Sequence, residues 1–148
     1  MSQNAPPVAC MSFHRNQRVT GVEVRTVRDS AEAWCCYSSD YEFLAPTSWH
    51  GEVRHRRRTL LLEPGQVLCM QPGDVFSARP AWIAGSGSAV TIEPSVLAEY
   101  VEEHPARLAG RRLVPHAPLS PELGARLADV FRAFHAECSA LEVQTSLV

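Results

Sequence analysis

The chain has 148 residues, of which 45% are apolar and 20% charged, which suits one globular domain with its own core. Its formal net charge is −2 although all 14 basic residues are arginine, which argues against a generally basic nucleic-acid-binding protein. No apolar run reaches the roughly 20 residues of a membrane-spanning helix, so we expect no membrane partner. The N-terminus lacks the apolar segment of a signal peptide, and we expect a cytoplasmic protein whose five cysteines are reduced.

The first part of the chain predicts an arm followed by short strands. Residues 1–18 contain Pro6-Pro7 and show no sustained periodicity, so we expect a flexible N-terminal arm. Alternating, β-branched and aromatic residues then predict strands at 19–27, 34–37 and 41–44.

The middle of the chain, residues 51–78, carries two Pro-Gly pairs eight residues apart, Pro64-Gly65 and Pro72-Gly73. Proline presets the first corner of a turn, and glycine permits a positive φ at the next position. Regular turns with short apolar runs between them are typical of an antiparallel sandwich or barrel. A further strand is predicted at 88–93, with its entry loop at 85–87.

The last third predicts helices. Ser95 can cap a short helix that ends near His104, and a stronger helix begins after Ser120, with Pro121 in its first turn. Ser139 and Glu142 favour the start of another helix just before Val148, from which we expect the chain to continue in a longer protein. The helix after Ser120 carries one apolar stripe, formed by Leu123, Leu127, Val130, Phe131 and Phe134.

Short strands with Pro-Gly turns, followed by helices, resemble the N-terminal sensing domain of AraC-type transcriptional regulators. The segments that carry the resemblance are GEVRHR at 51–56, LEPGQV at 62–67, QPGDVFS at 71–77 and TIEPSVL at 91–97. The resemblance implies a mainly β fold, a cupin-like double-stranded β-helix that forms a small antiparallel barrel followed by C-terminal α-helices. It implies an effector-binding barrel at 19–94, a helical dimerisation segment at 95–148, and a helix-turn-helix DNA-binding domain beyond residue 148.

A sensing domain of this kind would bind a small-molecule effector inside the barrel and would contact DNA only through the domain beyond residue 148. A small barrel either fills its interior or encloses one ligand. On a continuous strand, Arg54, Arg56 and Arg58 would share a solvated face, so that His55 and Arg57 would point inward. Arg57 would then meet an anionic group of the ligand. The ligand-binding candidates are Trp34, Tyr41, Phe43, Trp49, His55, Arg57 and Phe76.

Enzymes of the cupin family usually hold a metal with several histidines. In this sequence the matching stretches read YSSDYE at 37–42 and Phe76 after the second Pro-Gly turn, while His50 and His55 would point to opposite faces of a strand. We therefore predict no metal, no cofactor and no catalytic residue. A small metal-dependent cupin enzyme, or a structural dimerisation module with a filled barrel, remain as alternatives.

The helix after Ser120 also predicts a homodimer. Its stripe is wide enough for one edge to pack on the barrel while the other meets the same helix of a second subunit. The alternative is a monomer whose whole stripe packs on its own core. The residues predicted at the dimer interface are Leu123, Leu127, Val130 and Phe134.

Overall fold

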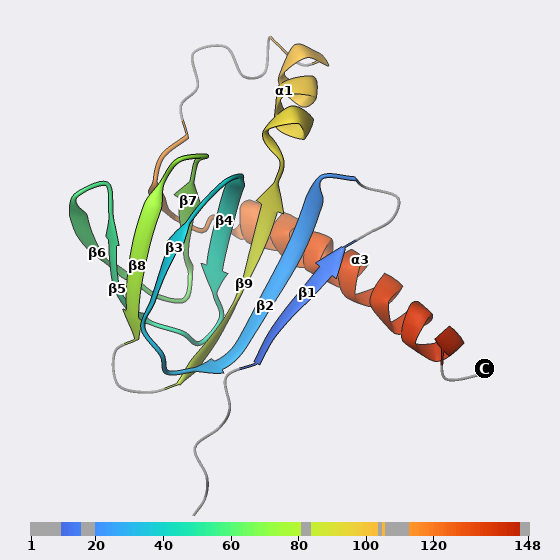
Figure 1. The fold of residues 1–148 in the computed structure, drawn as a ribbon, viewed down its shortest axis with the longest axis horizontal. Coiled ribbons are helices and arrows are strands. Elements are labelled where there is room, and N and C mark those ends of the chain that lie inside the picture. Colours follow the sequence, from blue (N-terminus) through green and yellow to red (C-terminus); the bar gives the residue numbers. More distant parts are fainter. Residues whose placement is uncertain (1–9, 16–19, 81–83, 104, 106–112, 146–148) are drawn as a thin grey trace, which may run out of the picture.

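The computed structural model describes residues 10–15, 20–80, 84–103, 105 and 113–145 (Figure 1). Within these ranges the chain forms strands first and a long helix last. The elements in chain order are β1 (Cys10–Arg15), β2 (Val22–Ser30), β3 (Trp34–Tyr37), β4 (Tyr41–Pro46), β5 (Gly51–His55), β6 (Arg58–Leu62), β7 (Gln66–Met70), β8 (Val75–Pro80), β9 (Gly85–Ile92), α1 (Pro94–Glu103), β10 (His116–Pro118) and α3 (Pro121–Thr145).

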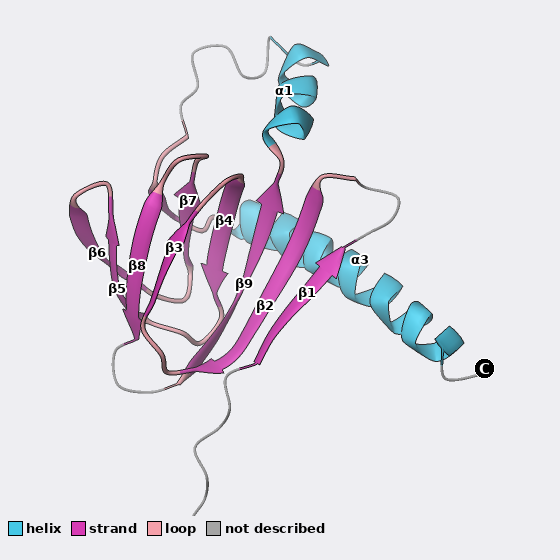
Figure 2. Ribbon diagram, in the orientation of Figure 1, coloured by secondary structure: helices cyan, strands magenta, loops and turns pink. Residues whose placement is uncertain are grey.

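The strands form two antiparallel sheets that face each other. One sheet has the order β1-β2-β9-β4-β7-β10 and the other has the order β3-β8-β5-β6. Figure 2 shows the strands gathered in the body of the molecule, with α3 crossing one side of it and α1 projecting from one end. The prediction of a mainly antiparallel β fold followed by helices is confirmed. No helix in the described ranges is both long and apolar enough to span a bilayer.

Both Pro-Gly pairs make the predicted turns. Gly65 and Gly73 have φ values of 87° and 91°, the left-handed region that glycine enters without steric cost. In the second turn the N–H of Asp74 donates to the carbonyl of Gln71 at 3.0 Å. Each Pro-Gly turn thus reverses the chain between two consecutive strands.

The arginine-rich stretch is not the continuous strand expected from the sequence. It is a hairpin, in which Arg56 and Arg57 form a two-residue turn with φ values of 48° and 62°. Such a turn matches the twist of the strands it joins, and it pairs His55 directly with Arg58. The inserted turn therefore resets the alternation of faces, and Arg57 is exposed at the tip instead of pointing inward.

Two predicted boundaries differ from the structure. Residues 10–15 of the expected arm form β1, which pairs with β2 along its whole length. Residues 1–9 and 16–18 of that arm lie outside the described residues. The predicted dimerisation segment, 95–148, also supplies β10 between its two expected helices, and β10 adds to β7 at the edge of the larger sheet.

The core lies between the two sheets. Its fully buried residues come from both sheets, with β5, β6 and β8 on one side and β7 on the other. Burial of such aliphatic and aromatic surface is the main source of stability in a domain of this size. The buried cluster consists of Trp49, Val53, Leu62, Leu68, Met70, Phe76 and Ala78.

Helix α3 covers the outer face of the larger sheet. Ser120 caps it as predicted, with its Oγ accepting the N–H of Leu123 at 3.2 Å. Phe134 is buried against Val24 of β2 and Val90 of β9. The helix runs without a break to Thr145, so Ser139 does not begin a separate helix.

The apolar stripe of α3 is thus largely used within the chain. Leu127, Val130 and Phe131 are half-buried against the same sheet, as the prediction that part of the stripe packs on the barrel requires. Phe134 is only 5% exposed, so it belongs to this contact and not to an interface with a second copy. Leu123 remains 41% exposed.

Candidate functional site

A pocket of about 330 Å³ opens into the barrel at the side where β2 and β3 belong to different sheets. Side chains alternate along each strand, so every second residue of β2 and β4 faces this space. Arg25 and Val27 reach it from β2, and Glu42 and Leu44 reach it from β4. Its volume lies within the range of roughly 300–1,000 Å³ that is usual for small-molecule sites.

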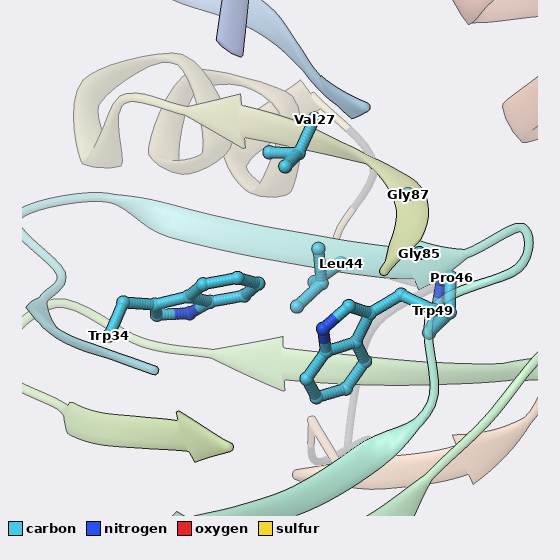
Figure 3. A pocket seen from close by; sticks show the side chains of 7 residues that line it. All are labelled: Val27, Trp34, Leu44, Pro46, Trp49, Gly85 and Gly87. Atoms are coloured by element: carbon cyan, nitrogen blue, oxygen red, sulfur yellow. The ribbon is translucent and has the colours of Figure 1, made fainter. Parts of the chain in front are cut away.

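The pocket continues inward into a narrow apolar recess of about 20 Å³ (Figure 3). The two spaces share Val27, Trp34, Leu44 and Gly87 as lining residues. In the recess the indoles of Trp34 and Trp49 approach each other, with ring centroids 5.5 Å apart and planes inclined by 34°. The inner end of the site is therefore an aromatic surface suited to a flat or apolar group.

Glycines of β9 hold Trp49 in this position. A Cβ on Gly85 would lie 2.3 Å from Cα of Trp49, so the close approach of the two backbones requires glycine. The carbonyl of Ser86 accepts the N–H of Trp49 at 2.9 Å. The sequence analysis expected a loop at 85–87, but these residues begin β9 and build one wall of the recess.

Arg25 and Glu42 bring charge to the lining of the pocket. Glu23, Thr91 and Glu42 lie directly across from one another on β2, β9 and β4, on the inner face of the sheet. Nε of Arg25 donates to Oε1 of Glu23 at 3.0 Å, and Nη1 of Arg25 lies 3.7 Å from Oε2 of Glu42. Burial raises the pKa of Glu42, and the guanidinium of Arg25 only partly offsets that rise.

Three buried side-chain atoms have no hydrogen-bond partner among the described residues: Nε1 of Trp49, Oγ1 of Thr91 and Nε2 of His55. Nε2 of His55 faces the carboxylate of Asp74, with Oδ2 at 3.0 Å. In Figure 3 the indole nitrogen of Trp49 lies on the side of the ring that faces Trp34. Buried polar groups are rarely left unpaired, because the lost hydrogen bond costs roughly 1–3 kcal/mol. Trp49 lines the recess, so its Nε1 marks a place where a bound molecule can supply the missing partner.

The cysteines are distributed over both sides of the sheets. Cys36 lines the pocket, and burial raises the pKa of its thiol. Cys35, its neighbour on β3, is exposed on the other face, in agreement with the alternation of a strand. Cys69 lies buried on β7 opposite Phe43, and burial raises the pKa of its thiol to about 11. The raised pKa values of Cys36 and Cys69 favour the protonated thiol at these two positions, which is the less nucleophilic form.

Three of the residues predicted from the sequence do lie at the site. Trp34 and Phe76 line the pocket, and Trp49 lines the recess. The register of β4 contradicts the assignment of Tyr41 and Phe43 to the same space.

Phe43 lies opposite Val90, whose side chain contacts α3, so it faces the helix side of the sheet. Tyr41, two residues away, shares that face. The strand instead presents Glu42 and Leu44 to the pocket, and both were missed in the sequence analysis.

His55 and Arg57 do not reach this pocket. His55 is buried as predicted, but its Nε2 lies 3.0 Å from Oδ2 of Asp74 in the second Pro-Gly turn. Arg56 donates to both carboxylate oxygens of Asp74, each at 2.9 Å. Although burial alone would raise the pKa of Asp74, the hydrogen bonds from Arg56, the N–H of Gln71 and His55 lower it to about 2.

The pocket residues do not fit the metal that cupin enzymes hold. The lining of the pocket contains no histidine, the residue type with which those enzymes hold the metal. Within the described ranges, no three His, Cys, Asp or Glu side chains are grouped in a way that would hold a metal ion.

Comparison with known proteins identifies the fold. A scan against protein-family models finds no match, and a search of curated proteins finds none either. Among solved structures, a cupin 2 conserved barrel domain protein from Salinispora arenicola has a TM-score of 0.50 and 13% identity, over 65% of this chain and 85% of that chain. A protein of unknown function from Rhizobium leguminosarum has a TM-score of 0.51 and 13% identity, over 62% of this chain and 86% of that chain. The likeness confirms the cupin-like barrel predicted from the sequence.

Proposed function

We propose that this cupin-fold chain is the effector-sensing domain of an AraC-type transcriptional regulator, and that it binds a small molecule without converting it. The observation that carries the proposal is the pocket of about 330 Å³ between the sheets, with an unpartnered indole N–H in the recess behind it. The assignment to AraC-type regulators rests on the sequence motifs at the two Pro-Gly turns and on the helices that follow the barrel. A regulator of this kind would act in the cytoplasm.

The lining indicates the class of effector. Trp34, Trp49 and Phe76 favour an aromatic or otherwise flat apolar body. Nε1 of Trp49 requires a hydrogen-bond acceptor on that body. Glu42 at the outer wall favours a donor or cationic group at the other end of the molecule, because a cation would offset the cost of ionising a buried carboxylate.

The position of α3 supplies a route for the signal. Along β2, Arg25 and Val27 face the pocket, whereas Val24 contacts the helix. Along β9, Ala89 faces the pocket and Val90 contacts the helix. An effector that moves these strands therefore also moves the surface on which α3 rests. In the full-length regulator, that movement would reposition a DNA-binding domain beyond residue 148.

We include a homodimer in this proposal, formed through the exposed edge of α3 that contains Leu123. Leu123→Glu should convert the dimer to a monomer and leave the barrel folded, because this side chain is 41% exposed in one chain. Sedimentation equilibrium of both proteins measures the change. A wild-type chain that is monomeric at high micromolar concentration would contradict the dimer.

The test of effector binding uses three small aromatic probes, each with a phenol oxygen that can accept the indole N–H: tyramine, 4-hydroxybenzyl alcohol and 4-hydroxyphenylacetate. We expect tyramine, which carries the cationic group, to bind best and to shift the tryptophan emission. Trp34→Leu should abolish the binding, whereas Tyr37→Leu on the exposed face of the same strand should leave it unchanged.

Two results would count against the proposal. Equal binding to both variants would place the ligand outside the pocket. A stoichiometric metal, found by elemental analysis of protein purified from its source, would favour the enzyme alternative.

A further inference from the structure

A second cavity, of about 570 Å³, opens on the opposite side of the barrel. It lies between β6, at the edge of the smaller sheet, and the segment that leads into β10, at the edge of the larger sheet. Neither edge strand is hydrogen-bonded to the other, so the gap between them is open to solvent. The lining residues are His55, Arg56, Arg58, Thr59, Leu60, Pro115 and His116, which together we call the basic cleft.

The register of the strands directs two basic side chains into this cleft. Arg58 lies directly opposite the buried His55, so both point toward the space between the sheets. On β10, His116 lies opposite Leu68, whose side chain belongs to the core between the sheets. Arg58 and His116 therefore face the cleft from its two different walls.

The charge of the cleft is unbalanced. Its ionisable lining residues are two arginines and two histidines, with no carboxylate among them. The side chain of Arg58 makes no hydrogen bond or ion pair to any residue in the described ranges. Arg56 uses Nε and Nη2 to bind Asp74, which neutralises that carboxylate and leaves Nη1 available.

The imidazole of His116 is held in place by Gln66. Its Nε2 lies 3.1 Å from Oε1 of Gln66, and the same oxygen accepts the N–H of Glu63. Oε1 is therefore an acceptor, so Nε2 of His116 donates to it. The ring at one wall is thus positioned before any ligand arrives, and the exposed guanidinium of Arg58 lies at the other wall.

The rim of the cleft also keeps arginine where the backbone disfavours it. Arg56 and Arg57 both have positive φ, a conformation for which glycine and asparagine are strongly preferred in two-residue hairpin turns. Strained residues of this kind concentrate at functional sites, because another benefit compensates for the strain. Of the two residues, Arg56 lines the cleft, where Asp74 holds its guanidinium.

We propose that the basic cleft binds the phosphate group of a small phosphorylated molecule. A phosphate offers several oxygens to donors that come from two sides, and arginine binds it through two parallel N–H groups. The volume of the cleft suits a small molecule, and its position between two sheets does not suit a nucleic-acid duplex. The proposal does not depend on the effector in the aromatic pocket, because the two cavities share no lining residue.

The test compares two arginine variants of the same hairpin. Arg58→Gln removes a charge inside the cleft, and Arg54→Gln removes the same charge from the exposed outer face of β5. Binding of inorganic phosphate and ribose 5-phosphate is measured by calorimetry at constant ionic strength, with ribose as the unphosphorylated control. We expect Arg58→Gln to lower the affinity for both phosphate ligands by about tenfold or more, and Arg54→Gln to lower it by less than about twofold. Arg58→Lys keeps the charge but not the two parallel N–H groups, so its loss of affinity should lie between these two values.

Three outcomes would overturn the proposal. One is no phosphate binding by the wild-type chain at millimolar concentration, and another is an equal loss in Arg54→Gln and Arg58→Gln. The third is binding of a short DNA duplex that competes with phosphate and weakens in both variants, which would assign the arginines to a nucleic-acid surface. Thermal unfolding of each variant verifies that it is folded, and His116→Gln gives a second, independent reduction of affinity if Arg58→Gln is unstable.

Discussion

The two openings of the barrel differ in chemistry although they arise from the same cause. Each lies on an open side between the two sheets, beside β2 and the edge strand β3 on one side and between the edge strands β6 and β10 on the other. The first is lined by indoles and by a buried carboxylate balanced by Arg25. The second is lined by arginines and histidines without a carboxylate. A two-sheet barrel thus offers two independent entrances, and the residues at the unpaired edges decide what each can bind.

The largest expected effect comes from breaking the aromatic side. Gly85→Ala should lower the free energy of unfolding by about 2–3 kcal/mol, because its Cβ would lie 2.3 Å from Cα of Trp49 and the two backbones must separate. The emission of Trp49 should change with it, whereas phosphate binding in the basic cleft should persist. Chemical denaturation followed by fluorescence measures both effects.

Gly124→Ala serves as the matched control, since its added methyl group would meet Leu119 only at 3.5 Å within a helix. This variant should be slightly more stable than the wild type. A Gly85→Ala protein with unchanged stability would show that Trp49 is not held by β9.

A smaller loss is expected on the basic side. Asp74→Asn should cost about 1–2 kcal/mol at neutral pH, because Arg56 and the buried His55 both lose their charged partner. The pKa of Asp74 is lower in the folded chain than its ordinary value, so its contribution is complete above pH 3.8 and is lost as the pH falls toward about 2.

The wild type should therefore lose stability in that window, and Asp74→Asn should lose less of it. Urea titrations between pH 2 and pH 5 compare the two. Asp129→Asn, in an exposed ion pair of α3, is the control and should change little. Identical acid profiles for Asp74→Asn and the wild type would exclude this role.

The smallest expected change in stability comes from Glu42, the buried carboxylate that distinguishes the aromatic pocket from the basic cleft. Burial raises the pKa of Glu42, so the folded state favours its protonated form and becomes less stable as the pH rises through that pKa. Glu42→Gln should gain a little stability at neutral pH and none at pH 3, while the binding of tyramine weakens. Glu52→Gln on the exposed face of β5 should show neither effect. A destabilised Glu42→Gln protein would mean that the link to Arg25 outweighs the burial.

The sequence was a good guide to the strands and turns but a poor guide to which face of a strand lines the pocket. The Pro-Gly pairs carry local information, since positive φ at Gly65 and Gly73 depends on those residues alone. The assignment of Tyr41 and Phe43 failed because both faces of β4 are covered, one by the core and one by the helix side. Where both faces are apolar, alternation does not mark the interior, and an error of one residue exchanges the two faces.

The basic cleft could not be predicted from the sequence for a similar reason. A run of arginines at 54–58 reads as one strand, and nothing local indicates a turn at Arg56-Arg57, because arginine is unusual at positive φ. Only the pairing of His55 with Arg58 places the latter side chain between the sheets. His116, on the other wall, comes from the stretch between the two predicted helices, and a short window of sequence does not reveal long-range pairing at a sheet edge.

Cys69 gives the protein a built-in reporter of its own fluctuations. Its thiol is 6% exposed and has a pKa of about 11, while Cys35 and Cys36 are exposed. An alkylating reagent at neutral pH should therefore label β3 at once, and should label β7 only during moments when that part of the sheet opens. The ratio of the two rates gives the free energy of that opening. A ligand that stabilises the closed barrel should slow the labelling of Cys69. Binding can therefore be detected with a ligand that carries no fluorescent or radioactive tag.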